Sequence, residues 1–503
     1  MKKIILFFAC FTLLNSCSEE QPKPQKYNPT WESLANHNEQ PEWLKDAKLG
    51  IYFHWGAYCV PAFQGEWYPR NMYRKGDNAY NHHRETYGDD FNYHDFVPMF
   101  KAEKFDPAKW AELFKEAGAK FAGPVAEHHD GFSMWDSEVT PWNSMDKGPK
   151  RDILGELYAE FDKVGLKTIA TFHHARNRQR YSNNWQEEVA NKGNESWRKF
   201  QNSHYPYFPE YQEVFNDPEN AMLYGTAYKE DAEWEEKVWL AKLEEVIDKY
   251  RPDIIWFDSW LDQISEINRQ KFAAYYLNAA EEWKKEVVIV RKQEDLPLEV
   301  SINDHEKSRE PKVQENLWMT DDTFSTGSWC YTENLKIKPT SMIVHSLIDA
   351  VSKNGVLLLN ISPMADGTIP DNQVKGLKEI GVWLEKYGEA IYNTRPWKIA
   401  GEGPTVEPEG GFSDNKKFLQ LKYSSKDIRY TASKDKKTIY AFVMGIPTDN
   451  ETIAMSNLSG LAISNVEALT GDKIDWEMGK NGLSITVKNS TGQYAYPIKI
   501  SLK

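Results

Sequence analysis

Six short apolar segments recur between residues 49 and 361 and predict the strands of one sheet. Most are continuous apolar runs, without the polar–apolar alternation of a half-exposed strand. Parallel strands that are covered on both faces have this pattern. The predicted strands are Leu49–His54, Lys120–Ala126, Leu166–Phe172, Asp253–Phe257, Val287–Arg291 and Gly355–Ile361.

Amphipathic segments with helical periodicity alternate with these strands. In the third of them, Trp234, Val238 and Leu243 fall on one stripe while Glu and Lys fill the rest. Repeated strand-then-helix order favours a (β/α)8-like TIM barrel over residues 41–396. A doubly wound sheet is less favoured, because no Gly-rich phosphate turn follows any strand. The predicted helices are Pro107–Ala117, Arg151–Val164, Ala232–Tyr250, Arg269–Lys285, Pro339–Ser352 and Asp371–Tyr387.

The pattern changes after Arg395-Pro396-Trp397. Residues 401–411 are rich in Gly, Pro and Glu, and short alternating stretches replace long helical periodicity. This pattern predicts a C-terminal antiparallel β-sandwich over residues 397–503. Nothing in it marks a site, so we expect it to pack against the barrel rather than to contact carbohydrate. The alternating stretches are Phe418–Tyr423, Thr438–Val443, Leu483–Val487 and Tyr496–Leu502.

The first residues have the pattern of an export signal. Lys2 and Lys3 precede an apolar run that ends at Leu14 and is too short to span a membrane comfortably. Leu14-Asn15-Ser16-Cys17 resembles a bacterial lipobox, and an ordinary secretory signal is the alternative. We therefore expect a protein of the bacterial cell envelope, held at the membrane by its lipid alone. The predicted parts are a lipoprotein signal peptide at 1–16, lipidation of Cys17 and a tether at 17–40.

Charge and aromatic content narrow the choice of partner. Asp and Glu number 75 against 61 Lys and Arg, which gives a formal net charge of −14 without any basic tract. Phosphate contacts need Lys and Arg, so a nucleic-acid partner is excluded. Aromatic residues make up 14% of the chain, with 19 Trp and 26 Tyr. Such rings suit the apolar face of a sugar, although they also fill large cores.

Polar residues end four of the predicted strands, where barrel enzymes carry their reactive groups. Asp258 follows a run of Ile, Trp and Phe, which would hold a nucleophilic carboxylate rigidly; a helix cap or turn is the alternative. The other three ends are His54-Trp55-Gly56, Glu127-His128-His129-Asp130 and His173-His174. Glycoside hydrolysis with retention needs a second carboxyl group about 5 Å away. Glu306, Glu310 and Glu315 are candidates, because all three follow the fifth strand.

Cysteine and histidine spacing does not favour a metal site. Adjacent residues on a strand point to opposite faces, so the tandem pairs His82-His83, His128-His129 and His173-His174 rarely chelate one ion. Beyond Cys10 and Cys17, Cys59 and Cys330 are either two buried thiols or one disulfide. We expect no metal and no cofactor.

Several motifs in the correct order resemble the family 29 glycoside hydrolases, the α-L-fucosidases, from about residue 40 to 400. This resemblance implies a (β/α)8-like barrel with a C-terminal β-sandwich. The motifs are Leu49–Gly56, Glu66-Trp67-Tyr68, Ala117–Phe121, Glu127–Phe132, Arg251–Asp258, Ser328–Tyr331, Asn354–Pro363, Asp366–Pro370 and Arg395-Pro396-Trp397.

The resemblance also implies roles for individual residues. Asp258 matches the family nucleophile, and Glu306, in Asp304-His305-Glu306-Lys307-Ser308, falls where many members carry the acid/base, with Glu310 and Glu315 as alternatives. The implied activity is retaining exo-hydrolysis of terminal α-L-fucosyl residues from glycans. A non-catalytic surface glycan-binding protein and a retaining glycosidase for a related sugar are the alternatives. The substrate-binding residues expected from the motifs are His54, Glu66, Trp67, His128, His129, Trp256, Arg291 and Trp329.

Three segments depart from the family pattern. Glu127 stands where many relatives have Lys, Met319 where Glu or Gln is common, and His173–Arg176 where an aromatic-rich stretch is usual. A sulfated fucoside would give Arg176, Arg178 and Arg180 a purpose, but we expect a solvated loop there.

Overall fold

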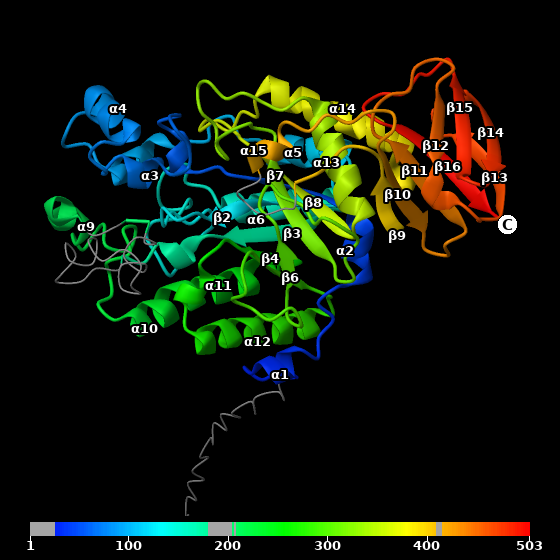
Figure 1. The fold of residues 1–503 in the computed structure, drawn as a ribbon. Helices are drawn as coiled ribbons and strands as arrows, with labels where there is room; N and C mark the ends of the chain where they lie inside the picture. The colour runs from blue at the N-terminus through cyan, green and yellow to red at the C-terminus, as the bar shows by residue number, and fades with distance from the viewer. Residues whose placement is uncertain (1–25, 180–203, 206–207, 409–414) are drawn as a thin grey trace, which may run out of the picture.

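The chain forms a closed barrel of eight parallel strands in the order β1 to β8 (Figure 1). The computed structural model describes residues 26–179, 204–205, 208–408 and 415–503, so Cys17, the signal peptide and Arg180 lie outside the described residues. The TIM barrel expected from the sequence is thereby confirmed. Its strands are β1 (Leu49–Phe53), β2 (Phe121–Glu127), β3 (Lys167–Phe172), β4 (Ile254–Phe257), β5 (Val288–Arg291), β6 (Ile302–Asp304), β7 (Trp318–Thr323) and β8 (Gly355–Ile361).

Helices cover the barrel except between β5 and β7, where turns and loops connect both strands to β6. Local signals fix where the helices begin and end. The side chain of Asp152 caps the start of α6, and Gly165 ends it in the left-handed conformation. The longer helices are α4 (Asn78–Tyr87), α5 (Pro107–Glu116), α6 (Ile153–Val164), α11 (Ala241–Tyr250), α12 (Glu266–Trp283), α13 (Thr340–Ser352) and α14 (Asp371–Tyr387).

Short helices complete the barrel domain. The expected helix 232–250 is continuous but mixed: α10 (Asp231–Trp234) passes through a π-helical turn, Glu235–Leu240, into α11. Near the N-terminus, α1 (Trp31–Leu34) packs on α12, where Trp31 donates a hydrogen bond to Glu266. The remaining short helices are α2 (Glu42–Ala47), α3 (Tyr68–Asn71), α9 (Gln212–Phe215) and α15 (Asn415–Phe418). Among the described residues, no helix has the length and apolarity to cross a membrane.

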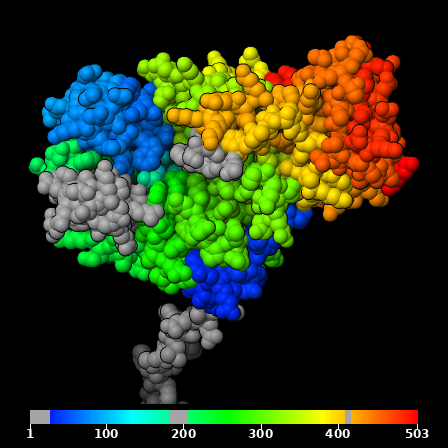
Figure 2. All heavy atoms as spheres, viewed as in Figure 1, coloured from blue at the N-terminus to red at the C-terminus, as the bar shows by residue number. Residues whose placement is uncertain are grey.

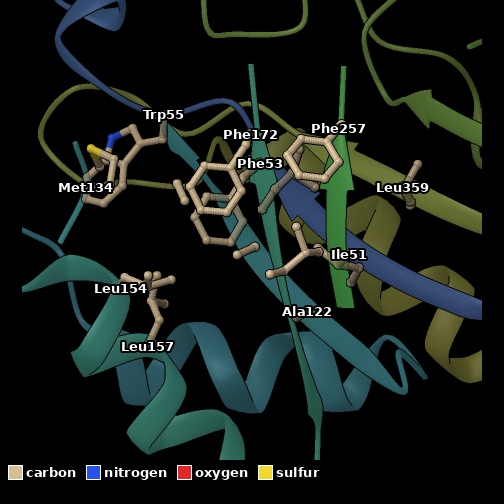
Figure 3. Close-up of a cluster of buried hydrophobic side chains, with 14 of the residues drawn as sticks. Ile51, Phe53, Trp55, Ala122, Met134, Leu154, Leu157, Phe172, Phe257 and Leu359 are labelled. Atoms are coloured by element: carbon tan, nitrogen blue, oxygen red, sulfur yellow. The ribbon is translucent and has the colours of Figure 1, made fainter. Parts of the chain in front are cut away.

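Alternate residues of each barrel strand face two separate apolar layers. Ile51 and Phe53 point outward to the helices, where Leu154 and Leu157 of α6 line the same layer (Figure 3). Tyr52 and Trp256 point inward and fill the barrel interior, and both are fully buried. Because both faces are buried, the strands are apolar throughout, and side chains two residues apart share a face.

The C-terminal domain is an antiparallel β-sandwich at the α13–α14 side of the barrel (Figures 1 and 2). Its larger sheet has the order β13-β16-β11-β10-β9, and its smaller one β12-β15-β14. Residues from both sheets form its core, including Ile428, Ile453 and Ile485. The strands are β9 (Thr394–Glu402), β10 (Ile428–Ser433), β11 (Thr438–Val443), β12 (Thr452–Met455), β13 (Ile463–Ala468), β14 (Lys473–Gly479), β15 (Gly482–Lys488) and β16 (Tyr496–Leu502).

One predicted strand of the sandwich is wrong. Residues 418–423 are not a strand: α15 ends at Phe418, and turns and loop follow it. The aromatic side chains of this segment instead meet cations, because Arg309 lies over the Phe418 ring and Arg429 over the Tyr423 ring. The alternating pattern of this segment thus reflects these ring contacts and not a strand.

Candidate active site

A cavity of about 520 Å³ opens at the carboxyl ends of the barrel strands. Eight of the residues expected from the sequence line it together: His54, Glu66, Trp67, His128, His129, Asp258, Glu306 and Trp329. Trp256 lies below, in the barrel interior, and Arg291 lies outside the lining. These residues come from five loops, those after β1, β2, β4, β6 and β7, so the barrel itself assembles the site.

The inward–outward alternation of the strands decides which side chains reach the cavity. Asp258 follows Trp256 by two residues and shares its inward face. Lys292 stands in the same relation to Val290, and it lines the cavity. Arg291 is one residue out of step, so its Nε donates to Asn303 Oδ1 at 2.9 Å instead. Lys292 is thus a site residue that the sequence reasoning missed.

Lys292 connects the two carboxylates expected to react. Its Nζ lies 2.8 Å from Glu306 Oε2, 3.4 Å from Asp258 Oδ1 and 3.1 Å from Asp321 Oδ2. Two oxygens that contact one nitrogen at these distances are no more than about 6 Å apart, which suits a retaining pair of carboxyl groups better than an inverting pair. Asp321 is itself held by the Tyr52 hydroxyl, which donates to it at 2.8 Å.

The two carboxyl groups have opposite protonation tendencies. Burial alone raises the pKa of Asp258, but the charge of Lys292 and the contacts with His173 and His129 outweigh it and hold that pKa well below its usual range. For Glu306, burial raises the pKa, and the negative charges of Asp321 and Asp258 raise it further. Lys292 lowers it, but the net effect is a raised pKa. At a pH between the two pKa values, Asp258 is therefore an anion while Glu306 keeps its proton. A nucleophile and a general acid require this arrangement.

The structure separates the three candidates for the acid. Glu306 lines the cavity and contacts Lys292. Glu310 pairs with His305 at 2.9 Å and is absent from the lining, and Glu315 is exposed. Next to Glu306, burial and the charge of Asp321 raise the pKa of Asp304 well above its usual range, so this carboxyl group holds its proton to a higher pH than an exposed aspartate does.

Histidines form the base of the cavity and are held by defined partners. His129 Nδ1 donates to the carbonyl oxygen of His173 at 2.7 Å, which directs Nε2 to Asp258 Oδ2 at 3.2 Å. His54 Nδ1 donates to Asn360 Oδ1 at 2.9 Å. Burial lowers the pKa of His54 to about 4 and that of His128 well below its usual range. Neutral imidazoles both donate and accept hydrogen bonds, as sugar hydroxyls require.

Glu66 and two tryptophans form the walls of the cavity. Glu66 Oε2 accepts hydrogen bonds from Ser328 Oγ and the Trp329 backbone N–H, each at 3.1 Å. The Trp329 ring is stacked on His54 with their centroids 5.3 Å apart. The Trp67 ring packs against the His129 ring, with their centroids 5.2 Å apart. The loops after β1 and β7 thus support each other around the cavity.

The segments that depart from the family pattern have identifiable environments. Glu127 is fully buried in an ion pair with Lys242 at 2.7 Å, and Met319 lies in the barrel interior. The expectation of a solvated loop is wrong for Arg176 and Arg178, which are 8% and 4% exposed. Arg176 lines the cavity, whereas the Nε of Arg178 is paired with Asp231 at 3.0 Å.

Cys59 and Cys330 are both free, buried thiols, which decides between the two alternatives left by the sequence. Burial raises the pKa of the Cys330 thiol well above its usual range, and the neighbouring Cys59 raises it further. The Cys330 thiol is therefore not a nucleophile at neutral pH.

Comparison with known proteins assigns both domains. Residues 13–389 match the family model described as Alpha-L-fucosidase, and residues 420–501 match the model described as Alpha-L-fucosidase C-terminal domain. Tissue alpha-L-fucosidase of Rattus norvegicus is 30% identical over 75% of this chain and 75% of its own length. Alpha-L-fucosidase of Dictyostelium discoideum is 28% identical over 90% of this chain and 87% of its own length.

Solved structures show the same similarity over nearly the whole chain. Thermotoga maritima alpha-fucosidase in complex with fucose has a TM-score of 0.70 at 30% identity, and covers 94% of this chain and 100% of its own. The same enzyme in complex with a mechanism-based inhibitor has a TM-score of 0.71 at 29% identity, with the same coverage of 94% and 100%.

Proposed function

Because the chain belongs to the α-L-fucosidase family, we propose that it removes terminal α-L-fucosyl residues from glycans with net retention of configuration. The observation that carries this proposal is that Lys292 contacts both Asp258, whose pKa is held well below its usual range, and Glu306, whose pKa is raised. A retaining glycosidase needs this pair at this separation.

In the first step, an Asp258 oxygen attacks the anomeric carbon and forms a glycosyl ester. The bond from that carbon to the leaving oxygen breaks, and Glu306 donates its proton to the departing alcohol. Lys292 contacts both carboxylates, so it offsets the negative charge that moves from Asp258 to Glu306 during this step.

In the second step, Glu306 accepts a proton from water, and the resulting oxygen attacks the anomeric carbon. The ester bond breaks, Asp258 regains its charge and fucose leaves. While the ester exists, Asp258 no longer contributes a negative charge beside Glu306. The pKa of Glu306 is therefore lower in this interval, which suits its change from acid to base.

The shape of the cavity supports removal of a terminal residue. Tyr52 and Trp256 fill the barrel directly below and leave no passage through it, so a glycan enters by one end. His54, His128, His129 and Glu66 offer hydrogen-bonding groups to a sugar, and Trp67 offers an apolar face.

Replacing the nucleophile tests the scheme. Asp258→Ala is expected to abolish hydrolysis of aryl α-L-fucosides, and azide is expected to restore part of it as a fucosyl azide. Glu306→Ala is expected to lose much less activity on aryl fucosides with good leaving groups than on natural fucosylated glycans. Near wild-type turnover by Asp258→Ala, or equal losses by Glu306→Ala on both substrates, would contradict the assignments.

The sugar and the stereochemistry need separate measurements. A panel of aryl glycosides is expected to show a strong preference for the α-L-fucoside over related sugars, and proton NMR is expected to detect the α anomer first. Binding of fucose without turnover would instead support a glycan-binding protein.

For location, the lipobox-like Leu14–Cys17 supports lipidation of Cys17 and anchoring to the bacterial cell envelope. Mass spectrometry of the mature N-terminal peptide is expected to find a diacylated cysteine, and Cys17→Ser is expected to release the protein into the soluble fraction. An unmodified mature N-terminus would instead indicate an ordinary secretory signal.

A further inference from the structure

Three histidines from neighbouring strands meet at the base of the cavity. His54 follows β1, His128 follows β2 and His173 follows β3, and all three are buried. One ligand nitrogen of each lies within 4.8 Å of the other two. The three imidazoles come from the ends of three different strands, so they are not a tandem pair on one strand.

Each of the three imidazoles has a nitrogen available to a ligand. Asn360 Nδ2 donates to Thr323 Oγ1 and to the Trp329 carbonyl oxygen, which fixes Oδ1 as the acceptor. His54 therefore carries its proton on Nδ1, and its Nε2 holds the lone pair. The Nδ1 atoms of His128 and His173 are buried and have no hydrogen-bond partner among the described residues.

The spacing suits a small cation of nitrogen-preferring character. Tetrahedral Zn²⁺ with Zn–N bonds of about 2.1 Å places its ligand nitrogens about 3.4 Å apart, so ring rotations that bring the nitrogens closer by up to about 1.4 Å complete the site. Asp258 and Glu66 line the same cavity and favour a cation, whereas Lys292 and Arg176 oppose it. Three neutral nitrogens with an open fourth position are the usual ligand set of an accessible zinc ion.

We propose that His54, His128 and His173 bind a divalent transition-metal ion such as Zn²⁺ at the base of the cavity, where metal and sugar exclude each other. The proposed function assigns His54 and His128 to the sugar, so the competition rests on that function, whereas metal binding does not. Zinc thereby acts as a reversible competitive inhibitor of hydrolysis.

Calorimetric titration of the tag-free full-length chain with zinc chloride tests binding without using activity. One zinc ion is expected to bind per chain, and His173→Leu is expected to weaken its affinity by about tenfold or more. His82→Gln is the matched control, because His82 is stacked on Phe63, away from the cavity lining, and this variant should bind zinc as the wild type does. Absence of zinc binding, or equal affinity in His173→Leu, overturns the proposal.

Kinetics and diffraction locate the ion. Zinc is expected to raise KM for an aryl fucoside without changing kcat, and EDTA is expected to reverse the effect. Should His173→Leu fail to fold, anomalous diffraction from zinc-soaked wild-type crystals decides: a peak among the three histidines supports the proposal, and a peak elsewhere or none overturns it. Inactivity of the metal-free enzyme contradicts the proposed function and leaves the titration and diffraction results intact.

Discussion

Lys292 lowers the pKa of both reactive carboxyl groups, because one ammonium group contacts Asp258 and Glu306 together. Removing its charge in Lys292→Met raises both pKa values. Activity requires Asp258 ionised and Glu306 protonated, so the acid and basic limbs of the kcat/KM profile should both move to higher pH. We also expect kcat to fall by roughly 100-fold, since the charge offset during transfer is lost. Stopped assays across a pH series measure both effects.

Lys292→Arg serves as the charged control. It should keep both limbs near their wild-type positions even if the changed shape lowers kcat. If kcat/KM of Lys292→Met falls at every pH while both limbs of the profile stay in place, the lysine has only a packing role.

Lys48 destabilises the folded state at neutral pH. Its Nζ is buried without a hydrogen-bond partner among the described residues, and burial lowers its pKa to about 7. Between about pH 7 and 10 the unfolded chain binds more protons, so this group makes stability rise with pH in that window. We predict that Lys48→Met stabilises the protein at pH 7 by up to about 4 kcal/mol. Urea unfolding at pH 7 and pH 9 measures this, with a smaller gain at pH 9.

Lys45→Met is a suitable comparison, because Lys45 lies on the surface side of the same segment and pairs with Glu42 at 3.5 Å. It should change stability by less than about 1 kcal/mol at either pH. A destabilised Lys48→Met variant would show that the ammonium group has a partner in solution.

The sequence predicts most residues of the site, but it does not indicate which of two adjacent residues faces inward. Asp258 could be identified because one carboxylate ends an apolar run. Arg291 and Lys292 are both cationic and both follow a continuous run of Val and Ile, so the hydrophobic pattern does not show which of the two side chains faces the barrel interior. Only the pleat of β5, fixed by its neighbours in the barrel, places Lys292 in the cavity.

At the level of elements, six of the eight barrel strands follow from hydrophobic pattern, and two do not. β6 has three residues, Ile302–Asp304, too few for a periodic signal. β7 reads Trp-Met-Thr-Asp-Asp-Thr, and its polar residues suggest a loop. These residues are buried because Asp321 meets Lys292 and Asp322 meets Lys338, contacts that no local pattern reveals.

A buried ion cluster joins α13 to β10. Asp349 is fully buried, and its carboxylate lies 2.7 Å from Arg429 Nε and 2.8 Å from Lys353 Nζ. Although burial raises the pKa of Asp349, Lys353 and Arg429 hold it far below its usual range. We predict that Asp349→Asn costs about 3–5 kcal/mol of unfolding free energy, because Lys353 and Arg429 then remain buried with only the Glu407 carboxylate between them. Urea titration at pH 7 measures the change.

The pH dependence follows from the same shift. A carboxyl group with a lowered folded-state pKa stabilises fully above its unfolded value, near 4, and loses this contribution as the pH falls below it. The gap between wild type and Asp349→Asn should therefore narrow from pH 5 to pH 3. Asp475→Asn, which breaks an exposed pair with Lys488, should cost less than about 1 kcal/mol throughout. Equal losses in the two variants would contradict the role given to burial.

At the scale of the whole molecule, the sandwich shares a core with the barrel. Phe442 and Met444, at the end of β11, belong to the same apolar cluster as the barrel helices, and the Phe442 ring lies 6.3 Å from that of Trp383 on α14. Trp383 Nε1 also donates to the Gln493 carbonyl oxygen at 3.0 Å. The packing role expected for this domain has a physical basis in these contacts.

A shared core predicts that both domains unfold together. Calorimetry should show one transition, and Phe442→Ala should lower its midpoint while costing about 3–5 kcal/mol. Ile485→Ala, inside the sandwich core, is the matched control: it should lower the same single transition, because a sandwich that is lost exposes Phe442 and the barrel surface beneath it. Two separate transitions, with Ile485→Ala shifting one and leaving the barrel and its activity at their wild-type temperature, would show that the domains are energetically independent.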